Sequence, residues 1–230
     1  SFKPFPLDCV PRFDLDDSQF EEGDIVLRKG RTFVSSLISL ASPQDVSHCG
    51  ILVRQDSLWQ VIHTISGKIS DQDGVRINTL DEFIAAAEDH AIIHSKPAIP
   101  VDRTALVKRS RYYLHKNAPF DHSFDLEDSS RLYCSELIRC VFMESGTGDI
   151  FSYQTIAGKH IIDMQSFFDR QYFRVSEPIQ LMRSASDCEE MTKRASMPRG
   201  ISSVDASSRS APMIVPSVAT GKAGSSRHPI

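Results

Sequence analysis

Two short apolar runs with a polar connection between them constrain the fold of this 230-residue chain most strongly. Residues 47–53 read SHCGILV, residues 59–65 read WQVIHTI, and RQDSL separates them. Because apolar runs of this length around a short polar connection are typical of paired strands, we predict a hairpin. The hairpin would bring His48, at the mouth of the first strand, toward His63 on the second. A buried imidazole is unfavourable without a hydrogen-bond partner, so we expect a polar site here.

Further strands and helices are predicted around this hairpin. Strands are expected at 23–30, 74–80 and 90–97, and helices at 31–41, 80–89 and 102–117. Thr79 and Glu82 form a capping box that starts the helix at residue 80. Pro97 ends the third strand, and Pro119 follows the last of these helices. The elements together predict a mixed α+β fold with a central antiparallel sheet packed on helices.

A change in composition divides the chain. No aromatic residue follows Phe173, and residues 186–230 are rich in serine with scattered proline and glycine. Such a segment cannot bury enough apolar surface to offset the entropy lost on ordering. We therefore predict a folded domain over residues 1–183 and a disordered, Ser-rich tail over 184–230, which could equally link the domain to a partner.

Charge and cysteine content argue against several classes of protein. The formal net charge of -4 disfavours nucleic acid as a partner, because neutralising phosphates requires clustered positive charge. Five cysteines without a C-x-x-C pair indicate neither a disulfide framework nor a zinc ribbon. No run approaches the roughly 18 apolar residues of a membrane span, and no signal peptide is visible. We expect no integral membrane segment, and localisation stays open.

The segment 119–146 carries the sharpest chemical signal. It begins as an acidic loop and continues as a predicted helix with apolar residues on one face and Gly146 near its end. Cys134 lies in the first turn, where unpaired backbone N–H groups and the helix dipole favour an anion. A thiol in this position should have a pKa below the ordinary value of about 8.5.

Nucleophilic catalysis by cysteine needs a thiolate, an imidazole that accepts and returns the proton, and a polar group that orients the imidazole. Cys134 is the candidate nucleophile, His48 the candidate base and His63 the candidate orienting group. The backbone N–H of Cys134 is an expected donor to the oxyanion, together with a second donor that the sequence does not identify. A cysteine and histidine pairing arises easily by chance in a chain with eight histidines, so spacing supports this assignment without deciding it.

Four segments together carry a family resemblance: SHCGILV at 47–53, VIHTI at 61–65, PFDHSFD at 119–125 and LYCSELI at 132–138. Over residues 22–145 the chain resembles the permuted branch of the NlpC-type papain-like cysteine peptidases, of which the bacterial YiiX-like proteins are examples. In that branch the histidine strand precedes the cysteine helix. The resemblance implies a circularly permuted papain-like fold with Cys134 as nucleophile, His48 as base and His63 as the third polar residue.

Two positions depart from the family pattern. The third polar residue, often a glutamate in YiiX-like proteins, is His63 here, and Phe120 stands where a tyrosine often precedes the aspartate. Asp121 matches that aspartate by position. We therefore predict substrate contacts at the rim of the groove for Asp121 and Tyr133, with Asp24 as a weaker candidate. An acidic rim would suit a cationic group such as an amine.

The resemblance implies a cysteine hydrolase that cleaves an amide through a thioester, without a cofactor. For NlpC-type relatives the usual substrate is an amide in the peptide stems of bacterial peptidoglycan. An enzyme of that kind acts in the periplasm or cell wall. It could be an antibacterial effector, with an immunity or delivery protein as a further partner.

Other readings of the same residues stay open. The lecithin-retinol acyltransferase group also places two histidines before the cysteine, so the chain could be a lipid acyltransferase or thioesterase. A non-catalytic binding module on the same fold is a third possibility. The expected partner is a peptidoglycan peptide or another amide or acyl substrate.

Three further features have plain structural explanations. Cys49 and Cys140 are expected to pack in the core, with Cys49 pointing away from the face that carries His48. His90 and His94 are four residues apart, which suits two zinc ligands on a helix, but they lie in a predicted strand. We therefore expect a solvated or edge location for these two rings and no metal site.

Overall fold

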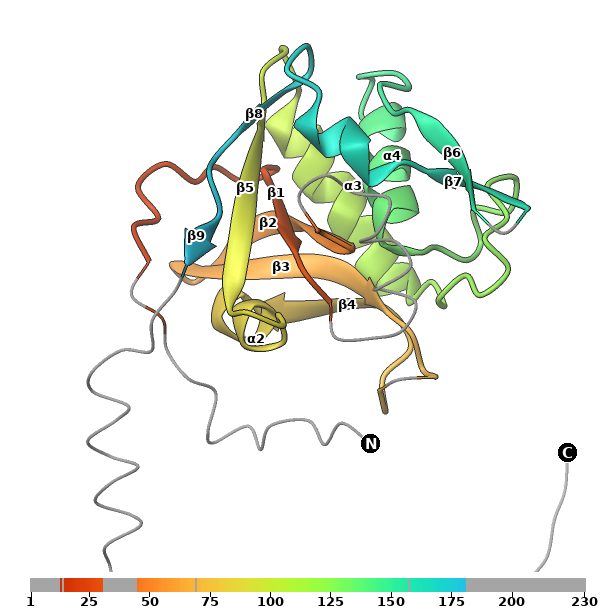
Figure 1. The fold of residues 1–230 in the computed structure, drawn as a ribbon, viewed down its shortest axis with the longest axis horizontal. Helices are drawn as coiled ribbons and strands as arrows, with labels where there is room; N and C mark the ends of the chain where they lie inside the picture. The colour runs from red at the N-terminus through yellow and green to blue at the C-terminus, as the bar shows by residue number, and fades with distance from the viewer. Residues whose placement is uncertain (1–12, 14, 31–44, 69, 157, 181–230) are drawn as a thin grey trace, which may run out of the picture.

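An antiparallel sheet of seven strands forms the centre of the computed structural model, which describes residue 13 and residues 15–30, 45–68, 70–156 and 158–180 (Figure 1). The strand order is β4-β3-β2-β1-β5-β8, and β9 pairs with β5. All of these pairs are antiparallel, which confirms the predicted α+β fold with a central antiparallel sheet. The strands are β1 (Ile25–Arg28), β2 (His48–Gln55), β3 (Leu58–Ile65), β4 (Gly74–Thr79), β5 (Ala91–Pro97), β8 (Phe173–Val175) and β9 (Ile179–Gln180).

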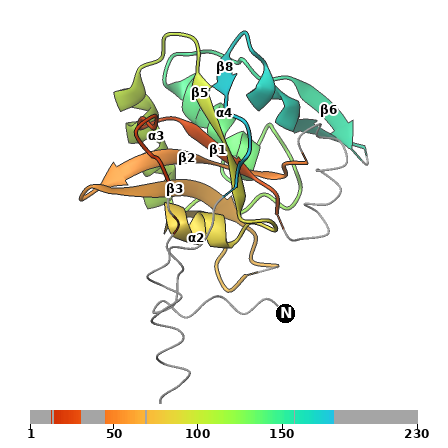
Figure 2. The same ribbon diagram turned by 60° about the vertical axis from the view of Figure 1, so that its left-hand side comes forward.

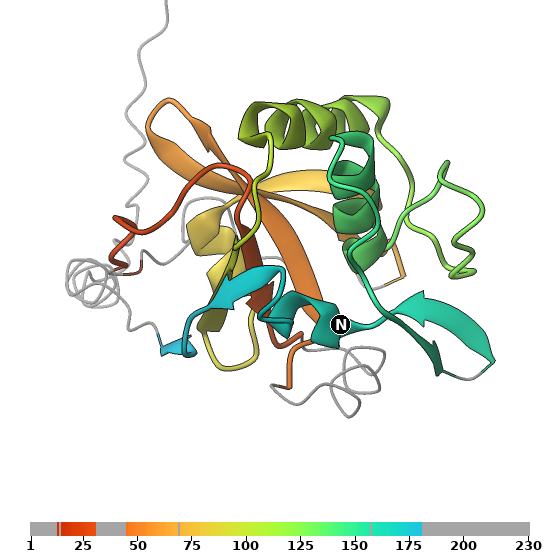
Figure 3. The same cartoon turned by 90° about the horizontal axis from the view of Figure 1, so that it is seen from above.

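Helices pack against both faces of this sheet (Figures 2 and 3). On one face Phe83 of α2 packs in a cluster with Leu52 of β2. On the other face Leu137 of α4 packs in a larger cluster with Ile51 of β2. Successive residues of β2 therefore serve two different cores, as expected for a strand covered on both sides. The helices are α2 (Leu80–Ala85), α3 (Arg103–Lys116), α4 (Cys134–Glu144) and the 3₁₀ helix η2 (Met164–Phe168).

The predicted hairpin is confirmed as the pair β2 and β3. Their register places Ile51 opposite Ile62, and the connection turns at Asp56 and Ser57. Both turn residues have positive φ angles, 48° and 70°, which suits the right-handed twist of the flanking strands. The capping box of Thr79 and Glu82 is likewise present at the start of α2.

Several sequence-based expectations differ from the structure or fall outside it. The helix expected at 80–89 ends at Ala85, and the strand expected from residue 90 begins at Ala91, because His90 has a φ of 54°. No element was predicted beyond residue 146, yet β6 (Tyr153–Ile156) and β7 (Lys159–Ile162) form a separate hairpin there. Their short, half-polar runs give little periodicity to read. The expected helix at 31–41 and the expected tail at 184–230 lie outside the described residues.

Over the ranges that the structure describes, no helix combines the length and apolar character needed to cross a bilayer.

Candidate active site

Cys134 is the first residue of α4, and its thiol is buried beside the start of β2. The preceding Tyr133 is extended, with φ −95° and ψ 174°, so the helix begins abruptly at the cysteine. The apolar face of α4, which includes Leu137, Ile138 and Val141, packs on the sheet and fixes the helix there. The predicted placement of Cys134 at a helix N-terminus is therefore observed.

Hydrogen-bond donors surround the sulfur of Cys134. Hydrogen bonding from the Cys49 side chain, and from the backbone of Cys49, Cys134 and Ser135, favours the ionised form of this thiol. The Cys49 side chain contributes most, and together the donors lower the pKa of the Cys134 thiol from its ordinary value despite burial. Burial raises the pKa of Cys49 well above its ordinary value, which keeps Cys49 protonated as a donor.

Cys49 is thus more than the packing residue that the sequence predicted. Its side chain is fully buried in the cluster beneath α4, as expected, but it also touches the candidate nucleophile. Strand alternation gave the correct face for Cys49. It could not indicate that Cys134 would lie on that same face, because this depends on where α4 crosses the sheet.

A chain of hydrogen bonds starts at the other candidate residues. His48 Nε2 lies 2.9 Å from His63 Nδ1, and His63 Nε2 lies 2.9 Å from Asn78 Oδ1. Asn78 Nδ2 in turn donates to Glu82 Oε2 at 3.0 Å, and Glu82 Oε2 also accepts from the Thr79 amide at 2.7 Å. The structure therefore brings His48 and His63 together, as predicted, and extends the chain by two residues that sequence reasoning did not include.

The two imidazole rings pack on Phe83 of α2. The His48 ring stacks on it with centroids 5.7 Å apart, and the His63 ring meets it edge-on at 5.3 Å. Burial and the nearby Arg28 guanidinium lower the pKa of His63 to about 4 and that of His48 well below its ordinary value. Both rings are therefore neutral at pH 7, the form in which His48 can accept a proton.

A glycine makes room for the two rings. A Cβ on Gly50 would stand 2.3 Å from Val61 Cγ1 and 3.1 Å from the Cβ of His63, so a larger residue would displace that strand. Gly50 lies between His48 and Leu52 on the face that α2 covers. Gly50 is therefore needed at this position, because any side chain there would collide with β3.

The candidate nucleophile and base lie toward opposite faces of β2. Cys134 and Cys49 lie on the α4 side of β2, whereas His48 packs toward α2. Among the residues that the structure describes, no hydrogen bond joins the Cys134 sulfur to His48. Catalytic hydrogen bonds in substrate-free enzymes are often long and tighten in the complex. The contact between nucleophile and base therefore stays a prediction.

The three predicted substrate-binding residues are all buried and hydrogen-bonded within the protein. Asp121 accepts from the Ser123 amide and hydroxyl and from the Asp125 amide, which shapes the acidic loop. Tyr133 accepts from the Ile162 amide through its hydroxyl. A role in substrate contact stays a prediction for both.

Asp24 lies at the opposite end of β1 from the residue paired with His48. Its carboxylate, fully buried, binds His94 Nε2 at 2.7 Å and an Arg103 nitrogen at 2.8 Å. The solvated or edge location expected for His94 is therefore wrong, because β5 lies inside the sheet and Asp24 satisfies the buried ring. In the described ranges, no group of three or more His, Cys, Asp or Glu side chains could hold a metal ion.

Glu136 is a buried carboxyl group that the sequence did not single out. It accepts from the Tyr133 amide through Oε2, and its Oε1 has no hydrogen-bond partner among the residues that the structure describes. Burial raises the pKa of Glu136 to about 8. At pH 7 the group is therefore mostly neutral, and it does not oppose ionisation of the nearby Cys134 thiol.

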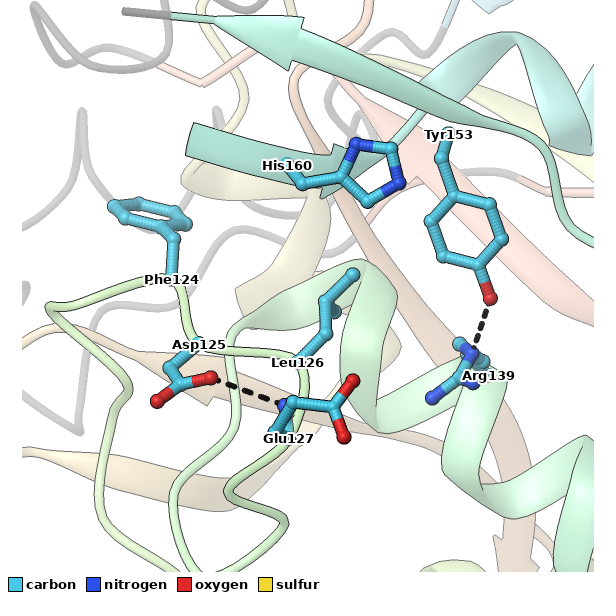
Figure 4. Close-up of a pocket in the computed structure, with 7 residues that line it drawn as sticks. All are labelled: Phe124, Asp125, Leu126, Glu127, Arg139, Tyr153 and His160. Atoms are coloured by element: carbon cyan, nitrogen blue, oxygen red, sulfur yellow. Dashed lines mark hydrogen bonds between the residues drawn. The ribbon is translucent and has the colours of Figure 1, made fainter. Parts of the chain in front are cut away.

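A cavity of about 360 Å³ lies beside α4, between the acidic loop and the hairpin of β6 and β7 (Figure 4). Arg139 reaches across it and donates through Nε to Tyr153 and Asp149. The lining residues are Phe124, Asp125, Leu126, Glu127, Arg139, Tyr153 and His160, none of which belongs to the hydrogen-bonded chain above. The cavity is thus separate from the candidate nucleophile.

Replacing Cys49 by alanine should raise the pKa of the Cys134 thiol, because it removes the strongest hydrogen bond to the sulfur. The loss of one such bond corresponds to a shift of up to about one pKa unit. Alkylation of Cys134 by iodoacetamide should then slow by up to about tenfold near neutral pH. The pH profile of alkylation, followed by peptide mass, measures this shift.

The matched control for this experiment is Cys140→Ala on the same helix. Burial raises the pKa of Cys140 to about 11, so this thiol contributes little to alkylation near neutrality. The control should leave the Cys134 profile in place. An unchanged midpoint in Cys49→Ala would contradict the assigned hydrogen bond.

Comparison with known proteins shows which family and which relatives this chain is similar to. The family described as permuted papain-like amidase enzymes, YaeF/YiiX, C92 family, matches residues 19–186. The YiiX protein of Escherichia coli strain K12 is 29% identical over 142 residues, which make up 60% of this chain and 64% of that protein. The chain thus spans less than two thirds of that relative.

A solved structure shares the fold. The crystal structure of metalloprotein YiiX from Escherichia coli O157:H7 superimposes with a TM-score of 0.60 at 21% sequence identity. The match covers 70% of this chain and 98% of that one. The likeness concerns the course of the backbone.

Proposed function

The chain belongs to the permuted papain-like amidase family, and on that premise we propose that it is a cysteine amidase with Cys134 as nucleophile and His48 as general base. The observation that carries the proposal is the environment of the thiol. Cys134 begins α4 among backbone donors that lower its pKa, beside the strand on which a neutral imidazole starts a hydrogen-bonded chain. A low-pKa thiol next to an oriented base is the general arrangement of cysteine nucleophiles.

The reaction proceeds in two steps. His48 takes the proton from the Cys134 thiol, and the sulfur attacks the amide carbon to give a tetrahedral oxyanion. As the C–N bond breaks, His48 returns the proton to the leaving nitrogen, and a thioester remains on Cys134. A water molecule, deprotonated by His48, then hydrolyses the thioester and restores the thiol.

Two features of the site bear on these steps. The backbone amides of Cys49, Cys134 and Ser135 face the sulfur and are the donors available to an oxyanion that forms there. The proposal also requires the His48 ring to reach the sulfur when substrate is bound, because no hydrogen bond joins them in the described part of the free chain.

The proposed substrate is an amide in the peptide stems of bacterial peptidoglycan. The family's amidase chemistry supports an amide substrate, and the likeness to NlpC-type enzymes supports the cell wall as its source. A cell-wall substrate would require access to the periplasm, so an immunity or delivery protein belongs to the same proposal.

Digestion of purified peptidoglycan by the protein tests this function. We expect new stem-peptide fragments with free termini, identified by mass, because cleavage of one amide adds the elements of water. A parallel incubation with phospholipid vesicles tests the lipid alternative. Release or transfer of fatty acyl chains without stem cleavage would contradict the amidase proposal.

A further inference from the structure

A series of hydrogen bonds runs from Glu82 through Asn78 and His63 to His48. Glu82 sets which group donates and which accepts at each step. Glu82 Oε2 accepts from the Thr79 amide, so it faces Asn78 as an acceptor. Asn78 must therefore present its Nδ2 hydrogens to Glu82 and its Oδ1 to His63. The orientation of the amide follows from the one partner in the chain that has no choice.

The same logic passes through the two histidines. Because Asn78 Oδ1 only accepts, His63 carries its proton on Nε2, and its Nδ1 is left with a lone pair. His48 Nε2 lies 2.9 Å from that lone pair and must donate to it. In a neutral imidazole one nitrogen donates and the other accepts, so His48 Nδ1 is the acceptor.

We propose that Asn78 and Glu82 are positioning residues that fix both histidines as Nε2–H tautomers and so leave His48 Nδ1 free to accept the thiol proton. This inference rests on the proposed amidase function and extends it beyond the three residues of the triad. Glu82 also caps α2 through Thr79, so the first turn of that helix is built into the site. Asn78 reaches His63 because β4 pairs with β3, with Asn78 opposite Val61.

The alternative tautomers show why the direction matters. If His63 carried its proton on Nδ1, it would donate to His48 Nε2, and His48 would then carry its own proton on Nδ1. A base that already holds a proton on the nitrogen facing the nucleophile has no lone pair there and cannot accept the thiol proton at that atom. In serine-protease triads a wrong tautomer of this kind costs about 10⁴-fold in rate.

Two substitutions should change the direction of these hydrogen bonds without disrupting the fold. Asn78→Leu removes both polar groups and leaves His63 Nε2 facing an apolar side chain, which favours the Nδ1–H tautomer of His63 and reverses His48. Glu82→Gln keeps the capping box, since glutamine serves at that position, but its amide can donate as well as accept. Asn78 is then free to turn over.

Nitrogen-15 NMR of the histidine rings, recorded on Cys134→Ala protein without substrate, reads the tautomers directly. We expect Nε2–H for His48 and His63 in the parent, Nδ1–H for His48 with Asn78→Leu, and mixed signals with Glu82→Gln. Arg76→Gln, on the same strand but outside the chain of hydrogen bonds, is the control and should change neither ring. Thermal melting checks that each variant is folded.

Activity measured in protein that keeps Cys134 then separates the claim about the tautomers from the claim about amidase function. Asn78→Leu should lower the rate of amide hydrolysis by at least about tenfold, toward the 10⁴-fold loss of a reversed tautomer. An Nδ1–H tautomer of His48 in the parent, or unchanged tautomers in a folded Asn78→Leu, would overturn this inference even if the enzyme cleaves amides. The expected tautomers in a protein inert toward amides would instead overturn the function alone.

Discussion

Cys134→Ala is expected to lower amide hydrolysis by roughly 10⁶-fold, to the level of the background reaction. Alanine leaves the start of α4 intact, because the helix is held by the apolar face that packs on the sheet. It removes the only atom that forms the proposed thioester. The rate of release of stem fragments from peptidoglycan, measured by mass at a fixed enzyme concentration, gives the loss directly.

The control for this experiment uses another buried cysteine of the same helix. Cys140 lies six residues beyond Cys134, and its side chain contacts Tyr113. Cys140→Ala should lose some stability, since it empties a small space in the core, but should keep the activity. Equal rates for the wild type and Cys134→Ala would show that the fold is used for binding without catalysis.

The expected rate loss depends on chemistry that was partly readable from the sequence. A cysteine before an amphipathic run predicted a thiol at a helix N-terminus, and the structure has it as the first residue of α4. The hairpin pattern likewise predicted that His48 and His63 would approach each other, and the two rings are hydrogen-bonded. These features follow from local periodicity and short connections, which a single sequence carries well.

The parts of the site that sequence reasoning missed depend on long-range packing. Asn78 has no signal of its own, since it joins the site only because β4 pairs with β3 in one register. Glu82 was predicted as a helix cap, and its hydrogen bond to Asn78, four residues earlier, joins the site only because Asn78 contacts His63. Cys49 contacts Cys134 because α4 crosses β2 at its first residues. A change of the β3–β4 register by one residue would turn Asn78 to the other face of the sheet and remove its contact with His63.

The burial of two acidic side chains also differs from what the sequence predicted. Asp121 and, as a weaker candidate, Asp24 were predicted to line the rim of a groove, yet both carboxylates are buried. Arg103 forms an ion pair with Asp24 and His94 hydrogen-bonds to it, whereas backbone amides satisfy Asp121. Buried carboxylates need such partners, and the partners come from elements far apart in the chain or from loop conformations. Charge in a sequence therefore indicated these residues without indicating their surroundings.

His48→Gln is expected to lower amide hydrolysis by roughly 10²- to 10⁴-fold at neutral pH, the usual contribution of a general base. Glutamine keeps a polar side chain beside His63 but cannot take up the thiol proton. The loss should be smaller than for Cys134→Ala, because a cysteine thiol retains some nucleophilicity without its base. The same peptidoglycan assay, repeated across a range of pH, measures both the loss and its pH dependence.

The direction of the pH dependence follows from the two pKa shifts. The pKa of His48 is lowered by burial, Arg28 and His63, so in the wild type the base is already neutral well below pH 6.5, and activity should persist into mildly acidic solution. In His48→Gln the rate should instead rise with pH as the Cys134 thiol ionises, with a midpoint below the pKa of an ordinary thiol because Cys49 stabilises the thiolate. The difference between the two proteins should therefore shrink as the pH increases. A constant ratio across that range would mean that His48 acts by holding the site together, and the base would have to be sought elsewhere.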